Sequence, residues 1–97
     1  MPVLRHSAPG TPPRVIPLQK DLVVIGRGQD CDLVLEDINA SRRHCQIRKW
    51  AGFYKIEDLQ SKNGTFVNGT KVAVANLGDG DLIAIGDQML LFKNEAT

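Results

Sequence analysis

The chain has 97 residues; 42% of them are hydrophobic, 24% are charged, and the formal net charge is +1. This length fits one small domain, and the composition is that of a folded chain rather than a disordered one. The charge balance gives no domain-wide basic field for nucleic acid or for an anionic membrane. No apolar run is as long as a membrane span and the first residues lack a signal-peptide core, so we expect a cytoplasmic domain.

Short apolar segments predict β-strands along most of the chain. Glycine and proline separate these segments, and no stretch has the spacing of a long amphipathic helix. Residues 7–13 contain three prolines and a glycine and therefore predict a loop. Pro17 confines its segment to an edge or an end of a sheet. In chain order the expected strands are Val3–Arg5, Arg14–Leu18, Leu22–Ile25, Leu33–Leu35, Cys45–Trp50, Phe53–Asp58, Thr65–Val67, Leu82–Ile85 and Met89–Phe92.

Many short strands at this regular spacing predict an all-β sandwich or barrel. Functional residues should then lie on loops at one end of a rigid scaffold. We expect a single domain over residues 1–97, with a core from about 3 to 92 and a polar tail or linker at 93–97. Trp50 is the only tryptophan, and we expect it to pack within this fold rather than to contact a ligand.

The residue patterns of common enzyme and metal sites are missing from the sequence. There is no P-loop, no G-x-S-x-G elbow and no H-E-x-x-H helix. The spacing of His6, Cys31, His44 and Cys45 does not fit a zinc site, and Asp79–Asp81 lacks the other ligands of a calcium loop. We therefore expect no catalytic residue, no cofactor and no metal. Two cysteines are too few for a disulfide scaffold and fit reduced thiols.

Three loop clusters instead carry cations and hydrogen-bond donors beside residues that permit turns. They are Gly26-Arg27, Ser41–His44 and Asp58–Gly69. If they meet in space, they offer guanidinium, ammonium, hydroxyl and amide groups. Such a set suits a doubly charged oxyanion, and a phosphorylated Thr or Ser carries about −1.5 to −2 charge and three acceptor oxygens. Arginine presents a planar fork that pairs with two of those oxygens.

These clusters resemble the signature of the forkhead-associated (FHA) domain, a phosphothreonine-peptide-binding module. The family pattern is G-R, then S-x-x-H, then S-x-N-G-T-x-x-N-G, and this chain has all three in order. Residues 77–86 resemble the closing L-x-x-G-D-x-I-x-x-G segment of the family, so the match extends from about Val3 to Phe92. The resemblance implies a β-sandwich of about eleven mostly antiparallel strands, with the binding loops at one end.

The resemblance also implies a role for each matching residue. Arg27 and Ser41 would bind the phosphate, and Arg42 would contact it beside them. Asn63 would hydrogen-bond the peptide main chain, and Lys62 would contact phosphate or peptide. Structural support of the site would come from four further residues, Gly26, His44, Gly64 and Asn68.

The expected function is non-catalytic recognition of phosphothreonine-containing protein segments in signalling or regulation. The partner would be a kinase or a kinase substrate, and the chain would be a monomer that binds neither nucleic acid nor membrane. One alternative is a single-stranded nucleic-acid-binding β-barrel, suggested by the basic stretches 42–44 and 48–50 but opposed by an aromatic content of only 5%. The other is a phospho-independent interaction module, opposed by the presence of Arg27, Ser41 and Asn63.

Overall fold

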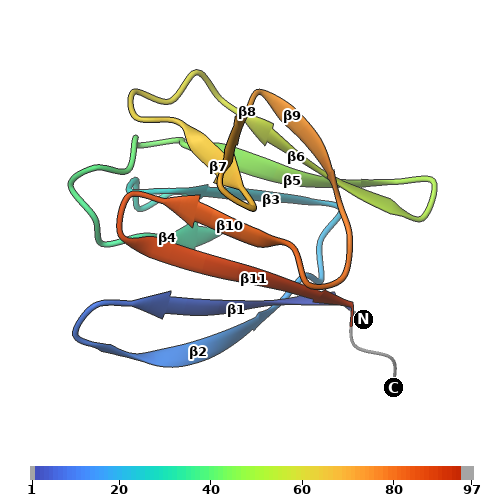
Figure 1. Cartoon of the computed structure of the whole chain (residues 1–97), viewed down its shortest axis with the longest axis horizontal. Coiled ribbons are helices and arrows are strands. Elements are labelled where there is room, and N and C mark those ends of the chain that lie inside the picture. Colours follow the sequence, from blue (N-terminus) through green and yellow to red (C-terminus); the bar gives the residue numbers. More distant parts are fainter. Residues whose placement is uncertain (1, 95–97) are drawn as a thin grey trace.

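In the computed structural model, which describes residues 2–94, the chain forms two β-sheets and no helix within that range (Figure 1). Within residues 2–94 there is accordingly no helix whose length and hydropathy would suit it to cross a bilayer. The strands in chain order are β1 (Pro2–Ala8), β2 (Thr11–Pro17), β3 (Leu22–Gly26), β4 (Leu33–Val34), β5 (Cys45–Trp50), β6 (Phe53–Asp58), β7 (Thr65–Val67), β8 (Thr70–Val72), β9 (Val74–Leu77), β10 (Leu82–Ile85) and β11 (Gln88–Asn94).

The strands form a two-layer sandwich. One sheet has the order β2-β1-β11-β10-β7-β8 and the other the order β4-β3-β5-β6-β9. The paired strands run antiparallel except for β3 and β4, which run parallel. The prediction of an all-β sandwich with about eleven mostly antiparallel strands is therefore confirmed.

The core lies between the two sheets because each inner face carries every second side chain of its strands. In β5, Cys45 and Ile47 are buried, and in β10, Ile83 and Ile85 are buried. Full burial of one large aliphatic side chain stabilises the fold by about 1.5–3 kcal/mol. The bulkiest fully buried apolar side chains come from both sheets and from the connection after β4: Phe92, Leu4, Ile25, Leu35, Ile47, Ile56, Ile83, Ile85 and Leu90.

The prediction of a loop over residues 7–13 was wrong. β1 continues to Ala8 and β2 begins at Thr11, so only a tight turn at Pro9 and Gly10 separates them. Gly10 has a φ of 75°, which glycine adopts without strain. Pro12 and Pro13 are tolerated because β2 is an edge strand of its sheet and its register with β1 shifts between the pairs His6–Arg14 and Ala8–Thr11, where these prolines lie. The expected edge position of Pro17 is thus confirmed.

Two short strands were missing from the sequence prediction. β8 and β9 are edge strands of the two sheets, and neither contains a fully buried side chain. Val72, Ala75 and Leu77 are only partly buried against the core, so these strands lack the clear apolar alternation that identifies a strand in sequence. At the other end of the fold, β11 reaches Asn94, two residues past the expected end of the core. Residues 95–97 of the expected tail lie outside the described residues.

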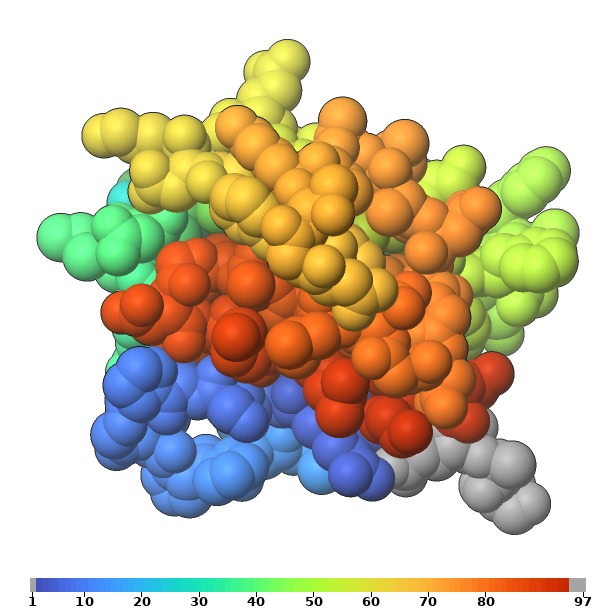
Figure 2. Space-filling view, in the orientation of Figure 1, coloured from blue at the N-terminus to red at the C-terminus, as the bar shows by residue number. Residues whose placement is uncertain are grey.

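The connections between strands gather at two opposite ends of the sandwich. The β3–β4, β4–β5 and β6–β7 connections lie together on the left of Figure 1, where the three clusters of turn residues and donors are located. The β5–β6 hairpin projects on the right, and it is also prominent in the space-filling view (Figure 2). The fold therefore places the candidate loops at one end, as predicted.

Candidate functional site

The connection after β3 lies directly against the loop before β5. The backbone N–H groups of Arg27 and Gly28 donate to the carbonyl oxygens of Ser41 and Arg42, both at 2.9 Å. Gly26 makes this approach possible, since a Cβ at that position would lie 2.3 Å from the carbonyl oxygen of Arg42. The glycine in the G-R pair is therefore needed for close backbone packing, and the arginine after it is held at the rim of the loops.

His44 joins the second loop to the third. Its side chain is fully buried; Nδ1 accepts a hydrogen bond from the backbone N–H of Ser41 at 3.0 Å, and Nε2 lies 2.8 Å from the carbonyl oxygen of Gly64. A backbone N–H only donates and a carbonyl only accepts, so the ring is the neutral tautomer with its proton on Nε2. The architectural role predicted for His44 matches this geometry.

Two further bonds connect the same loops at the surface. The hydroxyl oxygen of Ser41 accepts a hydrogen bond from the backbone N–H of Lys62 at 3.0 Å. This bond occupies an oxygen lone pair and leaves the hydroxyl proton available to donate. The side-chain amide of Asn63 donates to the carbonyl oxygen of Asn39 at 2.9 Å, which leaves its own oxygen available as an acceptor.

A carboxylate under the third loop was not identified from the sequence. Asp58 accepts hydrogen bonds from the backbone N–H of Ser61 at 3.0 Å, from its hydroxyl at 2.6 Å and from the hydroxyl of Thr65 at 2.7 Å. Burial acts to raise the pKa of Asp58, but these hydrogen bonds outweigh it, and the pKa lies below its ordinary value. The Ser61 hydroxyl in turn accepts from the N–H of Gly64. The signal in the sequence was an Asp followed three residues later by a Ser, a turn pattern.

The exposed cations of the loops differ in their partners. Nε of Arg27 donates to the carbonyl oxygen of Ala40 at 3.0 Å, which orients its exposed guanidinium. Arg43 forms an ion pair with Asp30 at 3.6 Å. Among residues 2–94, neither the guanidinium of Arg42 nor the ammonium of Lys62 has an ion-pair or hydrogen-bond partner. These two cations can therefore turn toward an anionic ligand without breaking an existing contact.

Gly64 precedes β7 and Asn68 follows it, and the two residues act on different parts of the structure. Gly64 has a φ of 93°, and the stem of Lys71 lies over it, so a side chain there would be strained. Asn68 lies at the far end of the strand, where its side chain bonds Asp81 and the N–H of Leu82, both at 3.0 Å. Asn68 shapes the β7–β8 hairpin through these bonds, and its predicted support of the site stays a prediction.

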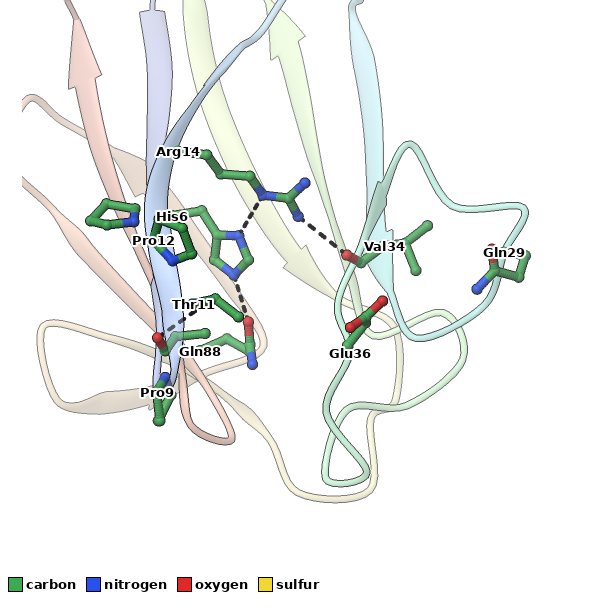
Figure 3. Close-up of a pocket in the computed structure, with 11 residues that line it drawn as sticks. His6, Pro9, Thr11, Pro12, Arg14, Gln29, Val34, Glu36 and Gln88 are labelled. Atoms are coloured by element: carbon green, nitrogen blue, oxygen red, sulfur yellow. Dashed lines mark hydrogen bonds between the residues drawn. The ribbon is translucent and has the colours of Figure 1, made fainter.

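A hollow of about 600 Å³ lies outside the three loops, beside the β1–β2 hairpin (Figure 3). On its wall, Nε of Arg14 donates to Nδ1 of His6 at 2.9 Å, and Nε2 of His6 donates to the side-chain oxygen of Gln88 at 2.5 Å. The Gln88 amide approaches Asp37, which also accepts from the N–H groups of Asn39 and Asp87. This polar chain anchors the turn that presents Asn39 to Asn63.

The described residues contain no group of three or more His, Cys, Asp or Glu side chains that could hold a metal ion. Both cysteines are free and buried. Burial raises the pKa of the Cys45 thiol to about 12, so the thiol next to His44 is held in its protonated form. The loops consequently present cations, a hydroxyl and an amide, and the buried Cys31 thiol donates to the carbonyl oxygen of Arg42 at 3.0 Å from behind the second loop.

Comparison with known proteins identifies the family. The FHA domain model matches residues 23–86, and the chain belongs to the FHA domain family. It is 46% identical over 72 residues to an ABC transporter ATP-binding/permease protein of Mycobacterium tuberculosis, covering 74% of this chain and 8% of that protein.

Solved structures agree with this assignment. One is Mycobacterium tuberculosis EmbR in complex with a low-affinity phosphopeptide, with a TM-score of 0.90, 37% identity and coverage of 99% of this chain and 25% of that one. Another comes from a structural and functional analysis of phosphothreonine-dependent FHA domain interactions, with a TM-score of 0.86, 33% identity and coverage of 98% and 99%. The first curated relatives are longer proteins, of which this chain spans 8%, 54% and 42%.

Proposed function

We propose that this chain is a non-catalytic recognition domain that binds phosphothreonine-containing segments of other proteins in signalling or regulation. The observation that carries the proposal is the bonding between the three loops, which brings Arg27, Ser41 and Asn63 to one rim. The related EmbR structure contains a phosphopeptide, and the other related structure concerns phosphothreonine-dependent interactions. These similarities support the same ligand class for this chain.

In the proposed complex the phosphate is held by charge and by directed donors. The guanidinium of Arg27 and the hydroxyl of Ser41 bind phosphate oxygens, and Arg42 adds a second cation. Each hydrogen bond to a charged group contributes about 1.5–3 kcal/mol when its geometry is good. Asn63 pairs with the extended peptide backbone through its free oxygen, and Lys62 contacts the phosphate or the peptide. Gly26, His44 and Gly64 keep these groups in place.

A binding role without catalysis is supported by the state of the candidate nucleophiles and bases. Both ring nitrogens of His44 are engaged in structural hydrogen bonds. The Cys45 thiol is buried and protonated. We further propose that residues 1–97 form one such domain, that it acts as a monomer in the cytoplasm, and that it needs no cofactor.

The test is calorimetric titration with one peptide in phosphothreonine and unmodified forms. We expect saturable binding of the phosphorylated form only. Arg27→Ala should weaken it at least about 100-fold, or roughly 3 kcal/mol, because it loses two charge-assisted bonds. Arg27→Lys should weaken it less, since lysine keeps the charge but not the planar fork.

Arg43→Ala is the matched control, because Arg43 lies in the same loops but pairs with Asp30. It should change the affinity by no more than a few-fold, and all three variants should retain the β-sheet circular dichroism of the parent. Equal affinity for the unmodified peptide would make the chain a phospho-independent module. Binding of oligothymidylate with a steep salt dependence, and none of phosphopeptide, would favour the nucleic-acid alternative.

A further inference from the structure

The β5–β6 hairpin carries an aromatic pair that the fold leaves uncovered. Trp50 and Phe53 lie directly opposite each other in the hairpin, and the two residues are 78% and 72% exposed. The prediction that Trp50 packs within the fold was therefore wrong. The turn between them, Ala51 and Gly52, has φ values of 52° and 81°, which keep the two strands paired up to the tip.

Strand alternation extends this pair into a defined surface. The next pair on the same face of the hairpin is Arg48 and Lys55, whereas the intervening pair, Lys49 and Tyr54, lies on the opposite face, where Tyr54 packs against the core. Together these outward residues border a hollow of about 550 Å³ that is lined by Arg48, Trp50, Phe53, Lys55, Glu57 and Asn76, which we term the hairpin surface. It lies on the hairpin that projects away from the candidate loops (Figures 1 and 2).

Exposed aromatic side chains beside cations are typical of binding surfaces. Contiguous apolar patches with a polar rim mark interaction sites, and tryptophan and arginine are enriched among the residues that dominate binding energy. The other described residues cover only a small part of each aromatic residue. A partner that covered both rings would remove apolar area from water without any rearrangement of the strands.

The charges of the hairpin surface indicate the chemistry of the partner. Glu57 is occupied, since its carboxylate accepts from the Gln46 amide at 2.9 Å and pairs with Nε of Arg48 at 3.3 Å. Within the described range Lys55 has no ion-pair partner. With two cations and one carboxylate, the surface has a net charge of +1. Lys55, whose charge also acts on Glu57, lies next to the aromatic pair. Charge complementarity therefore favours an acidic ligand.

Two other occupants fit these observations less well. A nucleic acid strand requires several cations along its backbone, and the hairpin surface offers a net charge of +1 with the Glu57 carboxylate inside it. A symmetric pair of copies would bring the same cationic surface of each copy together, which is unfavourable. A polypeptide segment that carries carboxylates beside a large apolar side chain complements both the rings and the cations.

We infer that the hairpin surface is a second binding site, which docks an acidic polypeptide segment through a large apolar side chain placed on Trp50 and Phe53. Lys55 pairs with a carboxylate of the segment. The site does not use the three loops, so it can operate whether or not a phosphopeptide is bound there.

Trp50 makes the test direct, because as the only tryptophan its fluorescence reports on this surface alone. The probe is an unphosphorylated peptide of alternating glutamate and leucine, titrated into the full chain at low salt. Binding should give a saturable blue shift of the emission. Peptides with lysine in place of glutamate, or serine in place of leucine, should bind at least tenfold more weakly.

Two variants and a control locate the site. Phe53→Ser and Lys55→Gln should each weaken binding of the acidic peptide about fivefold or more, whereas Val15→Ser, an exposed apolar residue of β2, should not. None should alter phosphothreonine-peptide affinity at the loops. The inference is overturned if the acidic peptide gives no saturable shift, if oligothymidylate binds more tightly than it, or if the emission depends only on protein concentration, as self-association would require.

Discussion

Nε2 of His44 lies 2.8 Å from the carbonyl oxygen of Gly64, although the two residues are 20 positions apart in the sequence. The same ring accepts the N–H of Ser41 through Nδ1. One buried imidazole therefore satisfies a donor from the second loop and an acceptor from the third, and it makes their separation independent of any ligand. The candidate site is preorganised by this ring, which lowers the conformational entropy that a peptide would otherwise lose on binding.

His44→Ala should consequently reduce both stability and phosphopeptide affinity. It leaves the N–H of Ser41 and the carbonyl of Gly64 without their partner, and an unsatisfied buried group costs about 1–3 kcal/mol. We expect a loss of about 2–5 kcal/mol in the free energy of unfolding, measured in urea, because a cavity adds to this. We also expect a loss of affinity of at least tenfold under conditions where the variant is folded.

Ile83→Ala is the control for that prediction. Ile83 is fully buried in β10 and forms no hydrogen bond between the loops, and its truncation should cost about 2–5 kcal/mol of stability. If the folded Ile83→Ala protein lost as much affinity as His44→Ala, the effect would come from general destabilisation. The specific role assigned to the His44 ring would then be wrong.

Gly26→Ala should separate the first two loops. The added Cβ would lie 2.3 Å from the carbonyl oxygen of Arg42 and 2.9 Å from the N–H nitrogen of His44, both of them backbone atoms that cannot rotate away. Strain of this kind costs about 1–3 kcal/mol, and the shift should displace Arg27 and Ser41 relative to each other. Urea unfolding and phosphopeptide titration should therefore both show a loss.

Gly78→Ala is the control: it makes the same Gly-to-Ala substitution at a position with open space around the added Cβ. Nothing lies closer than 3.8 Å to a Cβ at Gly78, and its φ is not positive. We expect a neutral effect, or stabilisation of about 0.4–1 kcal/mol through the unfolded chain. Unchanged affinity in Gly26→Ala would contradict the packing role given to this glycine.

Four strands, β5, β6, β7 and β10, were predicted with their observed bounds, and each contains buried positions that alternate with more exposed ones. β5 and β6 have a buried alternate position and a glycine turn between them, and both signals are local in sequence. β8 and β9 were missed because their apolar side chains Val72, Ala75 and Leu77 are only partly buried, and β9 in addition pairs with β6, which is distant in the sequence. The hydrophobic periodicity of a sequence indicates which residues are buried, not which strands pair. Exposed edge strands are therefore not detected by it.

The candidate site likewise contains residues that the sequence identified and residues that it did not. Arg27, Ser41 and Asn63 were identified from family motifs, and the loops that carry them do come together. Asp58 and Thr65 were not identified, because the Asp-x-x-Ser spacing signals only a turn, and the contact of the carboxylate with the buried Thr65 hydroxyl appears only in the fold. Trp50 was misjudged for a related reason: a tryptophan on a strand is usually packed, and only the position of the hairpin tip exposes it.

Cys45 should be inert in the folded chain. Burial raises the pKa of its thiol to about 12, so at pH 8 roughly one molecule in ten thousand carries the reactive thiolate. In a Cys31→Ser variant, which leaves Cys45 as the single thiol, labelling by a disulfide reagent should proceed only at the rate of unfolding. The rate should rise by orders of magnitude in urea. Rapid stoichiometric labelling in native buffer would contradict the burial of this group.

Asp58 should make both stability and binding sensitive to acid. Its pKa in the folded chain lies below the ordinary value of 3.8, because hydrogen bonds from Ser61 and Thr65 outweigh the opposing effect of burial. The carboxylate therefore stabilises the fold fully above pH 3.8, and this contribution is lost as the pH falls through the lower, folded-state pKa. Asp58→Asn should lower the free energy of unfolding at pH 7 by about 1–3 kcal/mol. Both carboxylate oxygens accept hydrogen bonds, but the amide keeps only one acceptor oxygen, and its remaining bonds are neutral.

Urea unfolding of the parent and of Asp58→Asn between pH 2 and 7 checks this directly. The difference between them should stay constant above about pH 5 and shrink below pH 3.8. Asp58→Asn should also weaken phosphopeptide binding at pH 7, because Ser61 and the N–H of Gly64 position the third loop through this carboxylate. Asp79→Asn is the control: the pKa of Asp79 is also lowered, by bonds to Asn94 and Lys93, but the residue lies away from the loops. It should leave the affinity unchanged. An equal loss of affinity in the two variants would show that charge, rather than the bonding beneath the third loop, is what the site requires.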